Sequence, residues 1–329
     1  MSERENILEV RNLTVQYVTD EGTAKAVNNL DLTLKKGATL GLVGETGSGK
    51  TTTALSILRL VPDPPGVIVD GEIFLNNENI LELSERDMDK RIRGNEVSMI
   101  FQDPMTSLNP VMTVGYQIAE VIRAHQKVNK AQAEEKAKEL LEIVGIPSDR
   151  IHEYPYQFSG GMKQRVIIAI ALACNPQVLI ADEPTTALDV TIQAQILDVM
   201  KSLKDKFEMS MIMITHDLGI VAEVCDEVSI IYSGRIVEHG TVEEVFNNTR
   251  HPYTEGLFRS LPRINDEREM LVPIPGMMPD SMELPKGCTF WPRCQYSIER
   301  CREEVPEKTH INQYHHVSCF VRSHLEEES

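Results

Sequence analysis

A glycine-rich pattern at residues 44–51 has the composition of a phosphate-binding loop. The fixed positions of the pattern G-x-x-x-x-G-K-[ST] are filled by Gly44, Gly49, Lys50 and Thr51. In such loops the backbone N–H groups point inward at an anion, and the following helix aims its positive end at the same phosphates. We expect Lys50 to reach the β- and γ-phosphates and the Thr51 hydroxyl to bind Mg²⁺. The expected nucleotide contacts are Gly44, Glu45, Thr46, Gly47, Ser48, Gly49, Lys50, Thr51 and Thr52.

Polar and acidic side chains follow three short apolar runs further along the chain. Gln102 follows residues 97–101, Asp182 and Glu183 follow residues 178–181, and His216 follows residues 211–215. Doubly wound sheets bind ligands at the carboxyl ends of their strands, so these side chains are candidates for a charged site. The alternatives are solvated loop acids and a structural histidine at a strand end.

A second anion-receptive helix start is predicted at Ser159-Gly160-Gly161, just before a long apolar helix that reaches residue 174. Serine followed by glycines is also a common N-cap sequence at the start of a helix. Taken alone, this motif is therefore weak evidence for an anion-binding site.

The elements that must position these residues alternate between strands and helices. Residues 39–43 read as a buried strand before the phosphate loop, residues 7–36 as a strand pair, and residues 82–93 as a charged surface helix. Helices are expected at 114–125 and 130–144, within a helical insert at about 103–165. The alternation predicts an α/β fold with a parallel core.

Composition limits the classes of function. The 329 residues carry a formal net charge of −17, which argues against general nucleic-acid binding because that needs a basic stripe. No N-terminal stretch has the pattern of a signal peptide, and the longest apolar run, 166–174, is far shorter than the ~20 residues of a membrane span. We therefore expect a cytosolic protein.

Taken together, the motifs resemble those of the ATP-binding cassette ATPases over roughly residues 7–255. They follow one another in the family's order: the phosphate loop, Gln102, Ser159-Gly160-Gly161, Asp182-Glu183, Ala187-Leu188-Asp189 and His216. The resemblance implies a P-loop NTPase (RecA-like) core with an antiparallel β subdomain and a helical insert. It also implies that two such domains close head to tail around two ATP molecules, so that each nucleotide meets one subunit's phosphate loop and the other's Ser-Gly-Gly signature.

The same resemblance implies roles for individual residues. Tyr17 is similar to the aromatic residue that stacks on adenine, and Gln102 to the residue that senses Mg²⁺ and transmits closure to a membrane subunit. Asp182 would hold Mg²⁺, Glu183 would orient and deprotonate the attacking water, and His216 would hold the γ-phosphate and that water. This fits phosphoryl transfer, which is mostly positioning and charge neutralisation.

Three segments are similar to the dipeptide/oligopeptide/nickel importer subgroup: residues 102–110, 158–162 and 251–253. The signature departs from the commonest family form, with Phe158 for leucine and Met162 for glutamine, but its Ser-Gly-Gly core is intact. The resemblance implies a nucleotide-binding domain at 1–255 and an importer-type extension at 256–329.

The partners expected from this resemblance are a second ATPase subunit, favoured as a paralogue, two membrane permeases and, indirectly, an extracytoplasmic binding protein. The chain would then lie on the cytoplasmic face of the membrane as a peripheral subunit and drive uptake of di- or oligopeptides. A nickel or other small-solute importer shares the same motifs and stays open. So does a soluble cassette ATPase acting on ribosomes or DNA, which the single cassette and the negative charge disfavour.

Four of the six cysteines lie in the last 42 residues, at Cys288, Cys294, Cys301 and Cys319. Their separations are longer than the two to four residues typical of paired zinc ligands, and iron–sulfur clusters accept looser spacing. Residues 287–294 are also similar to the segment that carries a four-iron cluster in some peptide-permease ATPases. We expect a [4Fe–4S] cluster, with Zn²⁺ or metal-free thiols as alternatives. The histidines that could replace a cysteine are His310, His315, His316 and His324.

Overall fold

The computed structural model describes residues 5–103, 107–186, 188–260 and 273–323. Ala187, His324 and residues 104–106, which belong to the sequence patterns above, lie outside this range. The chain forms two compact units. The first contains residues 1–7, 34–39 and 76–214, and the second contains residues 8–33, 40–75 and 215–329.

The first unit is built on three parallel buried strands: β6 (Val97–Ile100), β7 (Val178–Asp182) and β8 (Ser210–Thr215). Strand β7 lies in the middle, with Val97 opposite Val178 on one side and Val178 opposite Ser210 on the other. All three strands are short and buried along their whole length, as their continuous apolar sequences predict. Their carboxyl ends lead directly into Gln102 and into the acidic pair at 182–183.

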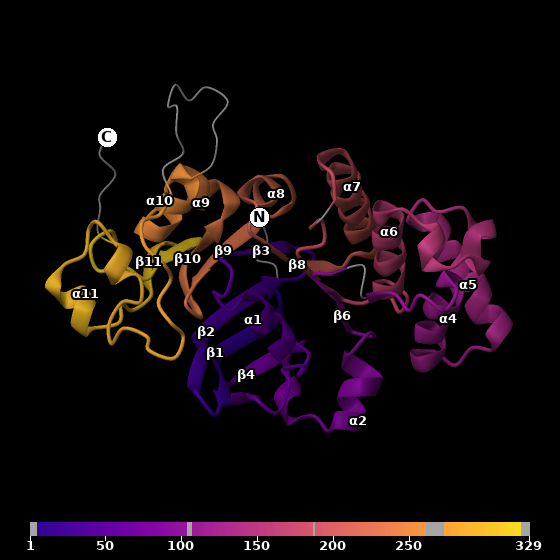
Figure 1. Ribbon diagram of the computed structural model, residues 1–329, viewed down its shortest axis with the longest axis horizontal. Helices are drawn as coiled ribbons and strands as arrows, with labels where there is room; N and C mark the ends of the chain where they lie inside the picture. Colours follow the sequence, from indigo (N-terminus) through magenta and orange to yellow (C-terminus); the bar gives the residue numbers. More distant parts are fainter. Residues whose placement is uncertain (1–4, 104–106, 187, 261–272, 324–329) are drawn as a thin grey trace. The chain divides into compact units, whose positions relative to one another are not determined.

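Helices make up most of the rest of this unit (Figure 1). Three of them, α4 (Val114–His125), α5 (Lys130–Ile143) and α6 (Gly160–Ala171), pack against one another, and α7 (Val190–Phe207) packs against α6. Short 3₁₀ turns lie at Ile80–Glu82, Ser148–His152 and Pro155–Gln157, and a two-residue strand, β5, at Glu78–Asn79. The expected helices at 114–125 and 130–144 are present in this unit.

The charged surface helix predicted at 82–93 is not continuous. It is replaced by a short α2 (Glu85–Asp87) followed by a π-helical turn, Met88–Ile92. The Ser84 hydroxyl accepts from the Asp87 N–H and starts a new turn. The Arg93 N–H then bonds to the Met88 carbonyl at 2.8 Å, and the wider turn buries both Met88 and Ile92.

The second unit contains an antiparallel sheet and a mixed sheet. Strand β1 (Asn6–Thr19) lies between β2 (Gly22–Lys35) and β4 (Gly66–Leu75), and it is antiparallel to β4. In the mixed sheet β3 (Thr39–Val43) runs parallel to β9 (Glu227–Tyr232), which forms a hairpin with β10 (Arg235–Thr241). The helices of this part are α1 (Lys50–Ile57), α8 (Leu218–Val224), α9 (Val242–Asn247) and α10 (Pro252–Arg259).

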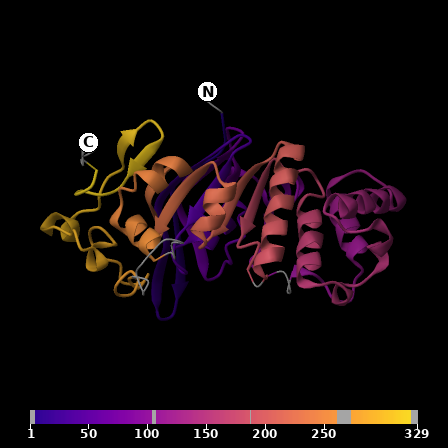
Figure 2. The same ribbon diagram turned by 90° about the horizontal axis from the view of Figure 1, so that it is seen from above.

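The C-terminal residues add two strands to this mixed sheet (Figure 2). Strand β12 (His315–Val317) pairs antiparallel with β10, with Val317 opposite Glu238, and β11 (Thr309–Asn312) pairs with β12. The remaining regular elements are a 3₁₀ turn at Trp291–Arg293 and α11 (Glu299–Glu303). The extension therefore shares a sheet and an apolar core with the strands that precede it, through Phe290, Tyr253 and Tyr232.

Across the described part of the chain, no helix has both the length and the apolar character needed to cross a membrane.

Candidate nucleotide and cysteine sites

The phosphate loop connects β3 to α1 in the second unit, and its shape requires glycine at two positions. Gly49 precedes α1 with a φ of 104°, in the left-handed region, and a Cβ there would lie 2.5 Å from the Ala26 carbonyl oxygen. A Cβ on Gly44 would lie 2.2 Å from the Ile231 carbonyl oxygen. The loop therefore passes against the backbone of β2 and β9 too closely for any side chain.

Lys50 is the first residue of α1, and its side chain turns back into the loop. Its ammonium group donates to the carbonyl oxygens of Gly44, at 2.7 Å, and Glu45, at 2.9 Å. The residue is only 7% exposed, so a positive charge is held inside a ring of backbone at the helix N-terminus. This arrangement can receive a phosphate anion.

Tyr17 and Thr52 lie next to each other at the same end of α1. The Tyr17 hydroxyl is 3.4 Å from the Thr52 Oγ1, and the ring is half-buried. Gly66 on the neighbouring strand makes room for the ring, because a Cβ there would lie 2.9 Å from the Tyr17 Cε1. Thr51, the residue expected to bind Mg²⁺, is exposed. This unit therefore brings together the residues expected to contact the phosphates and the adenine.

In the first unit, Glu183 is held by two side chains. Its Oε2 accepts from the Gln102 amide at 3.1 Å and from the Thr186 hydroxyl at 3.0 Å. Its backbone has a φ of 47°, which turns the chain out of β7, and its N–H donates to the Ile214 carbonyl at 2.9 Å. Asp182, one residue earlier, is 2% exposed at the end of β7. Sequence reasoning did not identify Thr186; its only signal was a hydroxyl residue three positions after the acid.

The Ser-Gly-Gly signature forms the N-terminus of α6. The Ser159 hydroxyl accepts from the Met162 N–H, and Ser159 and Gly160 are exposed. Gly161 faces α7, where a Cβ would lie 2.5 Å from the Ile192 Cγ2. Phe158 is buried beneath the Arg150 guanidinium, whose carbon is 4.4 Å from the ring centroid. The signature thus presents backbone N–H groups on a rigid support.

His216 follows β8, and its side chain is exposed. It belongs to the second unit, whereas Gln102, Asp182 and Glu183 belong to the first. The structure brings Gln102 and Glu183 into direct contact, and the role of His216 stays a prediction.

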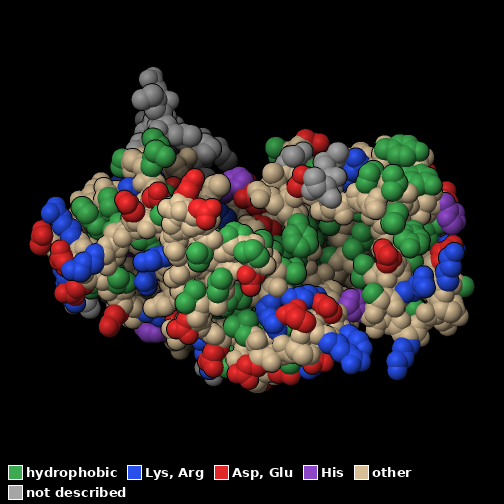
Figure 3. Space-filling view, turned by 60° about the horizontal axis from the view of Figure 1, so that its bottom comes forward, with side chains coloured by type: hydrophobic (Ala, Val, Ile, Leu, Met, Phe, Trp, Pro, Cys, Tyr) green, Lys and Arg blue, Asp and Glu red, His purple; other side chains and the backbone are tan. Residues whose placement is uncertain are grey.

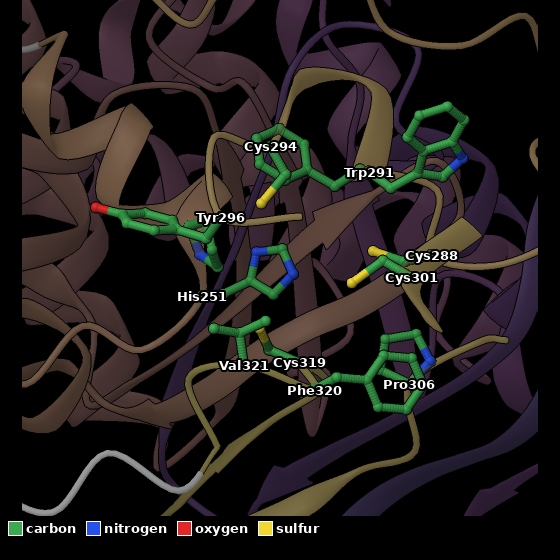
Figure 4. Close-up of a pocket in the computed structure, with 12 residues that line it drawn as sticks. His251, Cys288, Trp291, Cys294, Tyr296, Cys301, Pro306, Cys319, Phe320 and Val321 are labelled. Atoms are coloured by element: carbon green, nitrogen blue, oxygen red, sulfur yellow. The ribbon is translucent and has the colours of Figure 1, made fainter. Parts of the chain in front are cut away.

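The four C-terminal cysteines line one pocket in the second unit (Figure 4). Their sulfur atoms surround a common space that is otherwise lined by aromatic and apolar side chains, among them Phe290, Trp291 and Phe320. Burial, together with the neighbouring thiols of Cys301, Cys319 and Cys294, raises the pKa of Cys288 to about 12. The pKa values of Cys294 and Cys319 are also raised by burial.

His251 also lines this pocket, and sequence analysis used it only as part of the segment 251–253 that resembles the importer subgroup. It is 2% exposed, its Nδ1 accepts from the Tyr253 N–H at 3.1 Å, and burial lowers its pKa to about 4. Three of the histidines proposed as substitutes for a cysteine are described by the structure, and each of the three contacts another residue. His315 contacts Glu238 at 2.9 Å, and the His316 ring stacks on His239 with centroids 4.8 Å apart. His310 lies beside His316.

The cysteine pocket does not have the geometry of a single-ion site. Within the four described ranges, no group of three or more His, Cys, Asp or Glu side chains is arranged to hold a metal ion. The described side chains therefore provide no metal-holding arrangement, either for the zinc alternative or for the expected [4Fe–4S] cluster.

Two family models match the chain. The model for ABC transporters covers residues 27–186, and the model for the oligopeptide/dipeptide transporter C-terminal region covers residues 237–301. The first match includes the phosphate loop and the acidic pair, and the second includes His251 and three of the four cysteines.

Curated relatives match over nearly the whole chain. The oligopeptide transport ATP-binding protein OppD of Bacillus subtilis is 49% identical over 96% of this chain and 88% of the relative. The dipeptide transport ATP-binding protein DppD of the same organism is 46% identical over 97% of this chain and 95% of the relative.

Solved structures share the fold over a shorter span. The ATP-binding cassette MJ0796, a dimer in a post-hydrolysis state bound to ADP and Pi, has a TM-score of 0.64 at 26% identity and covers 71% of this chain and 98% of that one. The cbiO1 protein of Clostridium perfringens, part of the ABC transporter complex cbiONQ, has a TM-score of 0.64 at 27% identity and covers 74% of this chain and 92% of that one.

Proposed function

Since the chain belongs to the ABC transporter family and carries that family's oligopeptide/dipeptide transporter C-terminal region, we propose that it is the ATP-hydrolysing subunit of a peptide importer. The observation that carries the proposal is the combination in one chain of a complete phosphate loop around Lys50 with this C-terminal region. The relatives are named for oligopeptide, dipeptide and peptide transport, which favours peptides over the nickel alternative.

Each unit carries residues with proposed roles in binding MgATP. In the second unit Tyr17 would stack on adenine, the backbone of the loop and Lys50 would bind the phosphates, Thr51 would bind Mg²⁺, and His216 would bind the γ-phosphate. In the first unit Asp182 would hold Mg²⁺ and Gln102 would sense the ion. The metal supplies charge neutralisation at the phosphates.

Glu183 is proposed as the base that orients and deprotonates the attacking water. Its contacts with the Gln102 amide and the Thr186 hydroxyl support this role, because both fix the direction of the carboxylate.

The partners proposed for the chain follow from its family. The signature at α6 would complete the nucleotide site of a second ATPase subunit, for which we favour a paralogue. Two membrane permeases would hold the pair on the cytoplasmic face of the membrane, and an extracytoplasmic binding protein would deliver the peptide. Acidic and basic side chains are interspersed on the face shown in Figure 3, which agrees with the net charge of −17 in disfavouring nucleic acid.

Co-purification from membranes in mild detergent tests this proposal. The tagged full-length chain should be recovered with two permeases and a second cassette ATPase, and the associated binding protein should bind peptides rather than Ni²⁺. Recovery with ribosomes, or alone under conditions that preserve other transporters, would contradict it.

We also propose that Cys288, Cys294, Cys301 and Cys319 hold a [4Fe–4S] cluster. The convergence of four thiols on one apolar pocket supports it, because iron–sulfur clusters are held by four cysteine thiolates. Anaerobically purified protein should then be brown and contain about four iron and four sulfide per chain. Colourless protein with stoichiometric zinc would overturn the proposal.

A further inference from the structure

Glu45, the second residue of the phosphate loop, is fixed at three points. Its N–H donates to the Tyr253 hydroxyl at 2.9 Å, and its carbonyl oxygen accepts from Lys50 at 2.9 Å. Both of its carboxylate oxygens lie 3.1 Å from the same nitrogen of Arg293. Two of these three anchors, Tyr253 and Arg293, come from the C-terminal part of the chain, far from the loop in sequence.

Arg293 is itself rigidly held. Its side chain is 5% exposed, and its guanidinium also donates to the carbonyls of Pro275, at 2.9 Å, and Ile274, at 3.4 Å. The same nitrogen that contacts Glu45 is 3.3 Å from the Tyr232 hydroxyl. An arginine with these contacts cannot move away from the loop without losing several hydrogen bonds at once, and a buried guanidinium that loses its partners is costly.

Tyr253 is equally immobile. It is fully buried, and its ring packs on Tyr232, with centroids 4.6 Å apart, and on Phe290, at 5.4 Å. Burial raises the pKa of its hydroxyl, which therefore stays protonated and neutral at any physiological pH. The hydroxyl oxygen accepts a hydrogen bond from the Glu45 N–H, so this N–H points away from the interior of the loop.

The charge of Glu45 gives these contacts a consequence for nucleotide binding. A carboxylate in a loop that surrounds a polyphosphate repels it, because like charges a few ångströms apart interact strongly at a partly buried site. Glu45 is 30% exposed at its side chain, so water screens it only in part. The Arg293 guanidinium cancels this charge and at the same time fixes the direction of the side chain.

The extension also passes beside the loop at a second residue. A Cβ on Gly47 would lie 3.2 Å from the Met278 methyl carbon. This approach is apolar and does not involve Glu45, so the extension lies next to the loop at two residues.

We propose that Arg293 and Tyr253 are positioning residues for ATP, which act through Glu45 by fixing the phosphate loop and by cancelling its negative charge. This inference rests on the proposed function, because it takes the loop to be the ATP site. It assigns to the C-terminal extension a direct part in nucleotide affinity.

The test compares full-length variants by the Kd for MgATP, measured by titration calorimetry, with the thermal midpoint recorded for each. Arg293→Gln leaves the Glu45 charge uncancelled, and the Glu45→Gln/Arg293→Gln double variant removes that charge as well. Lys286→Gln is the matched control, because it removes another cation of the extension, one that pairs with Glu303 at 2.7 Å on the exposed surface.

Arg293→Gln is expected to raise the Kd for MgATP about tenfold, the usual effect of losing a charge-assisted hydrogen bond. The double variant should have a Kd for MgATP at least about threefold lower than that of Arg293→Gln. A purely structural role for Arg293 would not be rescued by a second substitution. Arg293→Lys should lie between wild type and Arg293→Gln, and Lys286→Gln should bind like wild type.

A folded Arg293→Gln variant with the wild-type Kd would overturn the inference, and so would a double variant that binds no better than Arg293→Gln. If Arg293→Gln does not fold, the Tyr253→Phe variant tests the inference instead. It keeps the ring packing but removes the hydroxyl that contacts Glu45, and it should raise the Kd for MgATP about threefold. An unchanged Kd in Tyr253→Phe would overturn the inference. Failure of the wild-type chain to bind ATP would instead remove the proposed function.

Discussion

Replacing Glu238 by alanine should loosen the C-terminal extension from the mixed sheet. Glu238 on β10 is fully buried, and its Oε1 accepts from the Arg250 N–H at 2.7 Å and from the His315 Nε2 at 2.9 Å. Its Oε2 accepts from the His251 N–H at 2.9 Å. One carboxylate therefore joins β10 to the start of α10 and to β12.

The magnitude follows from these three hydrogen bonds. Each hydrogen bond to a charged acceptor contributes about 1.5–3 kcal/mol, but bonds that share one acceptor group are not additive. Removing the carboxylate deprives two backbone N–H groups and one imidazole of the acceptor that they share. We expect Glu238→Ala to cost about 3–5 kcal/mol, because three hydrogen-bond donors lose their shared acceptor at once. Glu238→Gln keeps the shape and one acceptor oxygen, and should cost about half as much.

Hydrogen exchange measures this effect locally, so it does not require the two units to unfold together. The opening free energy of the amides at 250–251 and 315–317 should fall in Glu238→Ala. Glu243→Ala is the matched control, because Glu243 lies nearby in the first turn of α9 but is exposed. A loss below about 1 kcal/mol in Glu238→Ala, or one no larger than in the control, would refute the reasoning.

Three further predictions concern other sites. Glu183→Gln should slow ATP hydrolysis by about 10²–10⁴-fold with ATP binding retained, and near-normal phosphate release would exclude Glu183 as the base. Gly161→Ala should lower the free energy of unfolding by about 1–3 kcal/mol because of the contact with Ile192. Gly160→Ala, whose Cβ would be 3.5 Å from Leu188, should cost less, and equal thermal midpoints would contradict this. Burial raises the pKa of Cys174, so at pH 8 native Cys174 should react with iodoacetamide more slowly than it does in urea; equal rates by mass spectrometry would refute this.

The sequence predicted well those elements in which several nearby residues indicate the same structure. The helix expected at 114–125 is found at those residues because Thr113 caps it, its side chain accepting from the Tyr116 N–H, and because its apolar residues recur at helical spacing. The strands around 97–100 and 178–182 were predicted because continuous apolar runs mark strands buried on both faces. The phosphate loop was predicted because its backbone shape requires particular residues at fixed positions.

The features that were missed depend on contacts between distant residues. Arg293 and Glu45 are 248 positions apart, and neither residue type signals the other. His251 caps α10 and lines the cysteine pocket, two roles that its local sequence, His-Pro-Tyr, does not reveal. The π-helical turn at Met88–Ile92 was read as ordinary helix, because charge patterning says nothing about which hydrogen-bond register buries both apolar residues.

The pairing of β12 with β10 has a consequence for the solubility of the cassette. A strand at the rim of a sheet offers unpaired N–H and C=O groups to any other chain, and folded proteins protect such rims from aggregation. Here β12 covers the rim of β10, and the new rim, β11, is only four residues long with alternate residues exposed. Removing the C-terminal residues would uncover the part of β10 around Glu238 and His239 as a template for strand addition between copies. The extension thus covers the sheet edge at which strand addition between copies would begin, whatever its cysteines bind.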